Sequence, residues 1–201
     1  MRRIDSIEAL EALYGNPGEA AVVKVTDWLI PSYRAWIARS RFCVISTVGP
    51  EGADGSPRGD IEPVVEIEDD RTLLLPDWRG NNRIDTLRNI VRDPRIALMF
   101  MVAGSNNVMR VNGRAFVSDD PELTGRFEQQ GRHPRSVIVI SIEEVYSQCA
   151  RAVMRAGLWT DGDLSAGLPS IGDMLREATS GSFDGAAYDA DWPGRAAKSM
   201  W

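Results

Sequence analysis

Apolar and polar side chains alternate in the middle of the chain, which is the pattern typical of β-strands. In residues 108–117 the apolar positions fall on one face, and the polar positions Arg110, Asn112 and Arg114 fall on the other. Residues 96–102 are apolar on both faces, which predicts a strand buried between a barrel interior and another layer. Further strands are expected at 42–48, 64–68, 72–75 and 136–142. Six strands with short connections predict a small, closed or nearly closed β-barrel with peripheral helices, a mainly β (β+α) fold.

Helical spacing of apolar positions predicts helices before, between and after these strands. One lies between the cap residue Ser6 and Gly15, and a second begins at Pro31. Three more are expected at residues 83–92, 122–130 and 143–156. The stretch 49–60 (GPEGADGSPRGD) is rich in turn residues and is predicted to be a long hairpin loop.

The pattern divides the chain into three parts. Residues 1–40 are expected to be N-terminal helices that pack on the barrel, and residues 41–160 are the barrel domain. Beyond Gly157 the chain is rich in Gly, Ser and Asp, so residues 161–201 are predicted to be a helix with a poorly specified tail.

Charge and apolar run lengths exclude several classes of partner. The formal net charge of −6 argues against nucleic acid or an anionic membrane as the main partner. The longest apolar run, Ile96–Ala103, is far too short to span a membrane. The N-terminus has no apolar segment of a secretory signal, so we expect a cytoplasmic protein. Cys43 and Cys149 lie in apolar stretches and are expected to be reduced and buried.

The chain has a single histidine, which removes much catalytic chemistry from consideration. One histidine and two distant cysteines cannot complete a zinc site. His133 lies in the turn-like sequence GRHPR, where a loop histidine is a better interpretation than a member of a catalytic triad. No glycine-rich dinucleotide fingerprint or Walker A sequence is present. A bound cofactor is therefore expected to carry any difficult chemistry, and no catalytic side chain stands out.

A candidate anion site lies where a strand runs through a Gly-containing turn into a helix, in residues 73–93. A helix start at Asn81 or Asn82 would present unpaired N–H groups and a partial positive charge to a phosphate. Arg79 and Arg83 bracket this position, and Arg58 in SPRGD could reach the same anion. The residues alone also fit a capped helix and a turn that carry surface arginines.

Four blocks of sequence carry a resemblance to a known family. SPRGD, TLLLPDWRGNNRIDTLRNIVRDPRIALMFMV and MRVNGRAFV resemble the pyridoxamine 5′-phosphate oxidase-like, FMN-binding family in order and spacing. EEVYSQCARAVMRAGLW is similar to the signature of one branch of that family. The resemblance covers about residues 30–160 and implies a six-stranded split barrel that forms a homodimer with FMN at the subunit interface.

The resemblance also implies roles for individual residues. Asn82 and Arg83 match the position that holds the FMN phosphate, with Asn81 beside them, and Arg58 matches an arginine that approaches the cofactor. The residues that match the strand end along the isoalloxazine ring are Leu75, Pro76, Asp77 and Trp78. Residues Asn107–Arg110 match a strand that the family uses near the flavin, which makes Arg110 a candidate cofactor contact. Residues Gln148–Arg155 match the branch signature, which makes Gln148 a further candidate.

The chain also departs from the oxidases of this family. It lacks their C-terminal motif with arginine and histidine, and ends in AAYDADWPGRAAKSMW instead, so oxidation of vitamin B6 is not expected. We therefore expect an FMN-dependent oxidoreductase acting on another small molecule. The alternatives are a flavin-storage module, or a barrel that binds deazaflavin F420 or haem. Haem usually requires an axial histidine ligand, and F420 requires a wider basic groove for its longer tail.

Overall fold

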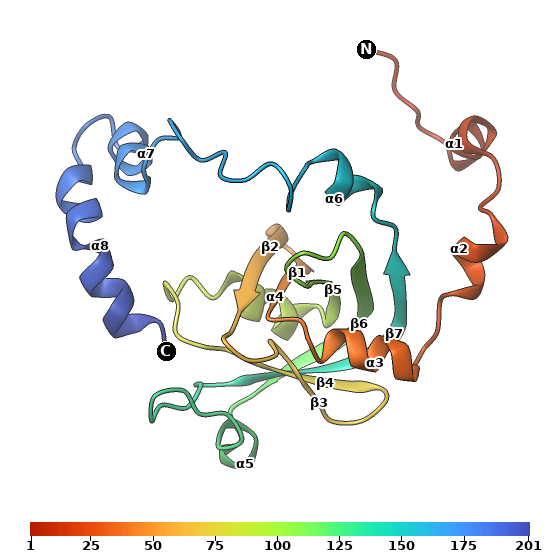
Figure 1. Ribbon diagram of the computed structural model, residues 1–201, viewed down its shortest axis with the longest axis horizontal. Coiled ribbons are helices and arrows are strands. Elements are labelled where there is room, and N and C mark those ends of the chain that lie inside the picture. Colours follow the sequence, from red (N-terminus) through yellow and green to blue (C-terminus); the bar gives the residue numbers. More distant parts are fainter.

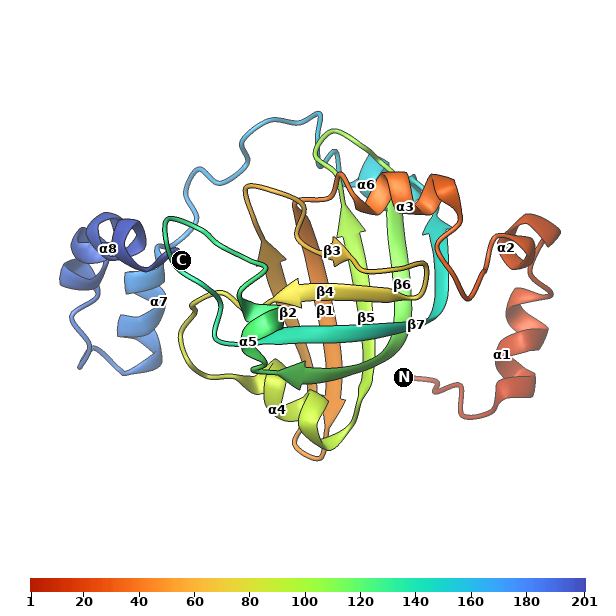
Figure 2. The same cartoon turned by 90° about the horizontal axis from the view of Figure 1, so that it is seen from below.

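The computed structural model describes residues 1–201, and its centre is one antiparallel sheet that curls into a split barrel (Figures 1 and 2). The sheet order is β2-β1-β5-β6-β7-β4-β3, so β2 and β3 are its two edges. The strands are β1 (Phe42–Gly49), β2 (Gly52–Gly59), β3 (Glu66–Ile67), β4 (Thr72–Pro76), β5 (Arg95–Met101), β6 (Val108–Ser118) and β7 (Val137–Gln148). The predicted barrel is confirmed, with one strand more than expected.

The additional strand is β2, in the stretch predicted to be a hairpin loop. It pairs with β1 along its whole length, from Phe42 opposite Gly59 to Gly49 opposite Gly52. The prediction was wrong because β2 contains the weak strand formers Gly, Ser and Pro, and only its pairing with β1 holds it extended. Pro57 is tolerated because an edge strand has a neighbour on one side only.

The two longest strands, β6 and β7, bend around the barrel together. Their pairing shifts register between Asn112 and Gly113, and a side chain at Gly113 would collide with the backbone of Ser141. Such a bulge increases the local bend and twist. Beyond it, β7 continues to Gln148, which pairs with Val108. The predicted helix over 143–156 is therefore wrong: this pairing extends the strand, and only α6 (Arg151–Arg155) is helical.

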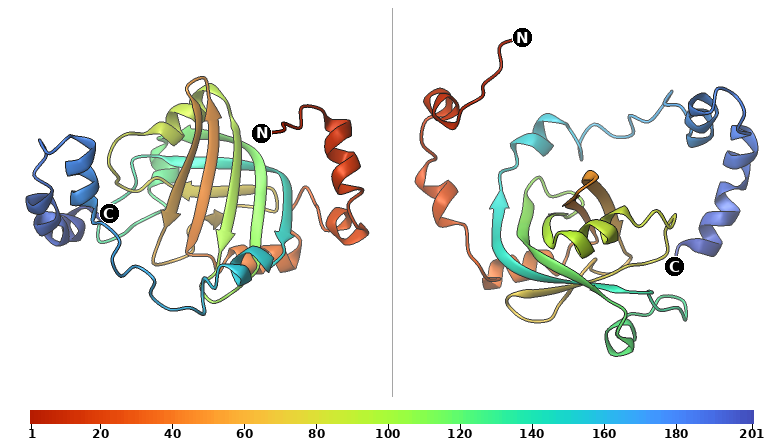
Figure 3. Two further views of the ribbon diagram at one scale, coloured as in Figure 1. Left: turned by 90° about the horizontal axis from the view of Figure 1, so that it is seen from above. Right: turned by 180° about the vertical axis from the view of Figure 1, so that it is seen from behind.

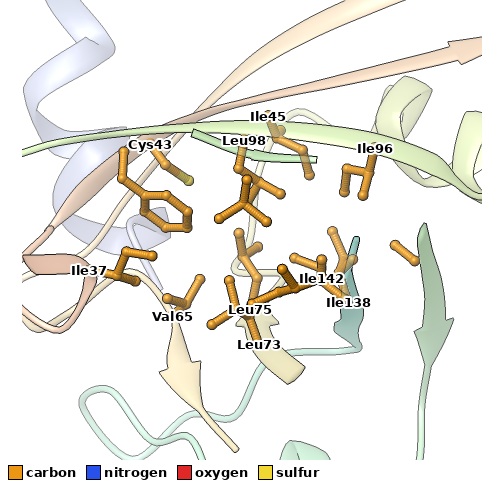
Figure 4. Close-up of a cluster of buried hydrophobic side chains, with 14 of the residues drawn as sticks. Ile37, Cys43, Ile45, Val65, Leu73, Leu75, Ile96, Leu98, Ile138 and Ile142 are labelled. Atoms are coloured by element: carbon orange, nitrogen blue, oxygen red, sulfur yellow. The ribbon is translucent and has the colours of Figure 1, made fainter. Parts of the chain in front are cut away.

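The barrel interior is filled by apolar side chains from every strand except β2 and from α3 (Pro31–Ile37) (Figure 4). Ile45, Leu98 and Ile138 are among its fully buried residues. Cys43 also lies in this core, where burial raises the pKa of its thiol to about 12. Cys149 is exposed, so the expectation of two buried cysteines holds only for Cys43.

Helices cover the barrel less completely than the sequence predicts. α4 (Asp85–Arg92) packs on β1, and α5 is limited to Pro121–Thr124, although a helix was predicted to residue 130. The chain turns after α5: Gln130 and Gly131 both have positive φ, and Gln129 bridges to Arg132. A continuous helix cannot accommodate that turn.

Two arms extend from opposite sides of the barrel (Figures 1 and 3). The N-terminal arm consists of α1 (Ile7–Tyr14) and α2 (Glu19–Val23), which bury no residue. Of the first three helices, only α3 buries a residue, Ile37. The other arm contains two helices, α7 (Ile171–Ala178) and α8 (Gly185–Ser199), where one was predicted. None of the helices combines the length and the apolar character that crossing a membrane requires.

Candidate functional site

A cavity of about 900 Å³ opens beside the end of β4. Three chain segments far apart in sequence form most of its lining: residues 54–61 of β2 and the loop after it, residues 76–87 from the end of β4 to the first turn of α4, and residues 135–136 before β7. Val64, Met200 and Trp201 complete it. Its volume is within the range of pockets that bind small molecules and cofactors.

One end of this cavity is the start of α4. The sequence predicts Asn81 or Asn82 as the N-cap, but the helix begins at Asp85, and Ile84 precedes it in a left-handed conformation. The asparagines form the loop instead: the side-chain oxygen of Asn81 accepts the backbone N–H of Arg83 at 3.1 Å, and Asn82 has a φ of 60°. No side chain caps α4, so its first N–H groups and its dipole are available to a bound anion.

Two ion pairs lie in the cavity wall. Arg58 and Asp77 are joined at 2.6 Å, and both side chains are largely buried. The Nε atom of Arg58 is buried and has no hydrogen-bond partner, so this side chain retains one donor that the protein does not use. Arg83 is paired with Asp85 at 2.8 Å, and this hydrogen bond raises the pKa of the exposed Arg83 guanidinium.

The remaining charges leave the cavity with positive groups that lack partners. Asp54 accepts a hydrogen bond from the Thr86 hydroxyl at 2.5 Å, and Asp60 accepts one from the Trp78 indole at 2.7 Å. Each of the four lining aspartates therefore accepts a hydrogen bond: Asp77 and Asp85 from arginines, and Asp54 and Asp60 from neutral donors. Arg79 and Arg135 line the same cavity and form no ion pair. The arrangement fits a ligand that carries negative charge.

Most of the site residues predicted from the sequence lie together in this cavity, namely Arg58, Pro76, Asp77, Trp78, Asn81, Asn82 and Arg83. Leu75 is not among them, because its side chain is fully buried in the barrel core. Arg110 and Gln148 lie on the outer face of the sheet, where they hydrogen-bond to each other at 3.3 Å. Within one chain the structure does not bring these three residues to the cavity.

The sequence prediction missed several lining residues. Thr86 and Asp54 meet only because α4 packs against β2. Arg135 could have been suspected, since it directly precedes a predicted strand, but only the pairing of β7 with β4 places it beside Asp77. Trp201 carried no local signal. His133 is absent from the lining, and its Nδ1 lies 2.7 Å from the carbonyl oxygen of Phe127.

Solved structures share the barrel at low sequence identity. HupZ of Group A Streptococcus is 16% identical with a TM-score of 0.50, and the match covers 59% of this chain and 93% of that one. General stress protein 26 of Bacillus anthracis is 20% identical with a TM-score of 0.43, covering 57% and 88% of the two chains. These similarities concern the fold alone.

Sequence comparison identifies the family. No curated protein is significantly similar to this sequence. The family model described as pyridoxamine 5′-phosphate oxidase matches residues 29–149, a range that includes all seven strands and the 76–87 loop of the cavity. The chain therefore belongs to the pyridoxamine 5′-phosphate oxidase family, whose members mostly bind flavins.

Proposed function

We propose that this protein binds FMN in the cavity beside α4 and uses it to transfer hydride or electrons to or from a small molecule. The observation that carries the proposal is the combination of two arginines without ion pairs, Arg79 and Arg135, with an uncapped helix start in one cavity. A phosphate monoester has roughly two negative charges near neutral pH. It would satisfy both the arginines and the N–H groups of the first helical turn.

The phosphate would be held by the loop that begins α4. Arg79, Asn82 and Arg83 lie on this loop, and Arg83 can keep the pair of its Nε with Asp85 while its terminal nitrogens donate to the ligand. Gly80 has no atom within 4 Å of the position where a side chain would begin, so the backbone there is open to close approach. This loop supplies donors in excess of acceptors, as binding of a phosphate requires.

The other end of the cavity suits a flat ring. Pro76, Trp78, Met200 and Trp201 provide apolar and aromatic surface, and the buried donor of Arg58 lies in the same wall. FMN bound there would supply the redox chemistry, while the protein would orient the ring and exclude water from it. The lining contains no histidine and no cysteine, so it offers no axial ligand of these types to haem.

The proposed homodimer is supported by the outer face of β1, β5 and β6. Side chains that are opposite one another in the register form apolar rows on this face: Val44 beside Met99, and Phe42 beside Met101. Phe42 is 40% exposed and Met99 36% exposed. An apolar sheet face of this kind is typical of a surface that another protein layer covers.

Arg110 and Gln148 continue the same two rows onto β6 and β7. A second copy placed on this face would cover them, and they would then face the partner rather than their own cavity. The predicted role of these two residues near the flavin is compatible with the structure only in such an assembly. Sedimentation at micromolar concentration tests this part, and a monomer would contradict it.

The cofactor proposal is tested by the visible absorption spectrum of the purified protein and the chromophore it releases on denaturation. Two flavin bands with released FMN are expected. A haem Soret band, released F420, or failure of the colourless protein to bind added FMN would contradict the proposal. Consumption of NADH or NADPH by the flavoprotein would support the oxidoreductase over the storage module. If the flavoprotein reacts with neither nicotinamide, and if its chemically reduced form does not react with dioxygen, the storage module would be favoured.

The phosphate site has a matched pair of variants. Arg79→Ala is expected to weaken FMN binding by about 1.5–3 kcal/mol, roughly 10- to 150-fold in Kd, through loss of a charge-assisted hydrogen bond. Arg88→Ala is the control, since Arg88 is an exposed arginine on α4 that does not line the cavity. Equal Kd values for the two variants would overturn the assignment of the phosphate to this loop.

A further inference from the structure

The end of the chain returns to the candidate cofactor cavity. Figures 1 and 2 show that α8 leads back from the arm toward the barrel, beside the loops at its open end. Met200 and Trp201 follow α8 and line the cavity. The ring of Trp201 meets that of Trp78 edge-on, with 5.4 Å between ring centroids and an interplanar angle of 83°. Such a T-shaped contact is a favourable arrangement of two aromatic rings.

Hydrogen bonds hold both tryptophans in place: one from the indole of Trp78, and one to the backbone oxygen of Trp201. The Trp78 indole N–H donates to Asp60 at 2.7 Å, and the side-chain amide of Gln129 donates to the same carboxylate at 3.3 Å. Asp60 therefore connects the loop after β4 with the loop before β7.

The loop before β7 in turn holds the end of the chain. Arg132 donates to the backbone oxygens of Trp201 at 2.7 Å and of Lys198 at 3.1 Å. Gln129 and Arg132 are themselves joined by two backbone hydrogen bonds of 2.9 and 3.0 Å. Asp60, Trp78, Trp201, Arg132 and Gln129 thus form a closed ring of contacts, here called the aromatic latch. It joins four segments that are distant in sequence.

The chemistry beside the latch indicates what it closes over. Trp78, Trp201 and Met200 give an apolar, aromatic wall, and Arg135 lines the same cavity without an ion pair. Arg135 is adjacent to Ser136, whose carbonyl accepts the backbone N–H of Asp77, so it lies close to the Trp78 loop. Aromatic surface with a nearby cation fits a flat, anionic or electron-rich ring.

We propose that the aromatic latch is a gate: Trp201 closes the cavity over a bound planar ligand and must move for that ligand to enter or leave. This inference rests on the proposed function for the identity of the ligand, FMN, but the latch itself is a property of the chain without ligand. A gate slows association and dissociation together and affects the equilibrium constant less.

The kinetic test uses FMN as the probe and stopped-flow flavin fluorescence as the readout. Trp201→Ala is expected to raise the FMN dissociation rate by about tenfold or more and to raise the association rate as well. Arg132→Ala, which removes the donor to the Trp201 backbone without altering a lining residue, should act in the same direction by a smaller factor. Trp192→Ala is the matched control, because Trp192 is an exposed tryptophan on α8 outside the cavity.

The outcomes separate failure of the gate from failure of the cofactor assignment. Equal rates for Trp201→Ala and Trp192→Ala would overturn the gate. If the wild-type protein binds no FMN, the proposed function fails, and the latch is tested without ligand by hydrogen exchange. Arg132→Ala should then accelerate exchange in residues 198–201 by about tenfold or more, while the first turn of α8 is unaffected. Unchanged exchange would overturn the latch.

Discussion

The two arms of the molecule resemble each other in helix content but differ in what holds them. In the N-terminal arm, Ile7 and Leu13 are 65% and 66% exposed, and the only side-chain hydrogen bond is the cap that Ser6 provides to α1. In the other arm, α7 and α8 pack on each other, and the chain that follows them is fastened to the barrel by Arg132. One arm is supported only by local sequence, and the other also by tertiary contacts.

This difference shows how little a helical pattern alone decides. α1 has a cap residue, an acidic first turn and a terminating glycine, yet an eight-residue helix is marginal without packing. Because α1 buries no residue, its apolar side chains add nothing to the barrel core of this chain. In the other arm α8 contains Pro193, which weakens its helical sequence, but its packing on α7 and the hydrogen bond from the Gly172 N–H to Asp189 at 2.9 Å compensate.

The sharpest contrast is between a leucine in the N-terminal arm and the leucine at its junction with the barrel. Leu29 is 1% exposed and belongs to the core, whereas Leu10 is 41% exposed. Leu29→Ala is expected to lower the free energy of unfolding by about 2–5 kcal/mol. Leu10→Ala should change it by about 0.5 kcal/mol or less. Guanidinium denaturation measures both, and equal losses would show that the arm is packed after all.

The contact between α7 and α8 can be broken at one residue. The backbones of Gly172 and Gly185 approach so closely that a side chain on Gly172 would collide with Gly185. Gly172→Val should destabilise this helix pair by about 1–3 kcal/mol, seen as faster hydrogen exchange in α8. Gly194→Ala is the control, because Gly194 has no atom near its side-chain position. Unchanged exchange in Gly172→Val would mean that the two helices do not depend on each other.

Removal of residues 1–23 is expected to have a small effect. These residues contain α1 and α2, which bury no side chain. The free energy of unfolding should therefore fall by less than about 1 kcal/mol in calorimetry or denaturation at low protein concentration. A larger loss would indicate that the arm is covered in solution, and repeating the measurement at several concentrations would show whether a second copy covers it.

The smallest expected effect is a pH dependence at the start of α7. The hydrogen bond from Ser170 lowers the pKa of Asp173 below its usual 3.8, within a reciprocal capping box. A depressed pKa stabilises the folded state above the unfolded value, and that contribution is lost as the pH falls through the folded pKa. Amide NMR signals of α7 should thus show fraying below about pH 4, and Asp173→Asn should remove this dependence. An identical acid response in both proteins would contradict it.

The core strands could be predicted from sequence because their alternation is local information. Phe42–Gly49 and Val108–Ser118 carry it, and the strands expected there are confirmed. The regions predicted wrongly depend on pairing across the sheet. β2 has a loop-like composition and is extended only through β1, and the end of β7 has helical spacing but pairs with β6. Non-local pairing overrides local propensity in both.

The candidate site divides in the same way. The loop from Asp77 to Arg83 is contiguous, so its clustering of Asn and Arg could be read directly, although the helix start was misplaced. Arg135 precedes a predicted strand, but only the pairing of β7 with β4 brings it to the cavity, and Trp201 reaches the cavity only through tertiary packing. The family resemblance placed Arg110 and Gln148 near a flavin, but one chain leaves them on the outer face, and their role stays a prediction.

The perpendicular arrangement of Trp78 and Trp201 also has an optical consequence. Two indoles held 5.4 Å apart couple their ultraviolet transitions, and we expect this coupling to give two circular dichroism components of opposite sign. Such a couplet requires both rings in fixed orientation and is absent when either one rotates freely. The Trp78–Trp201 pair is therefore expected to report on the cavity in the far ultraviolet without any label, and Trp192→Ala should leave that signal in place.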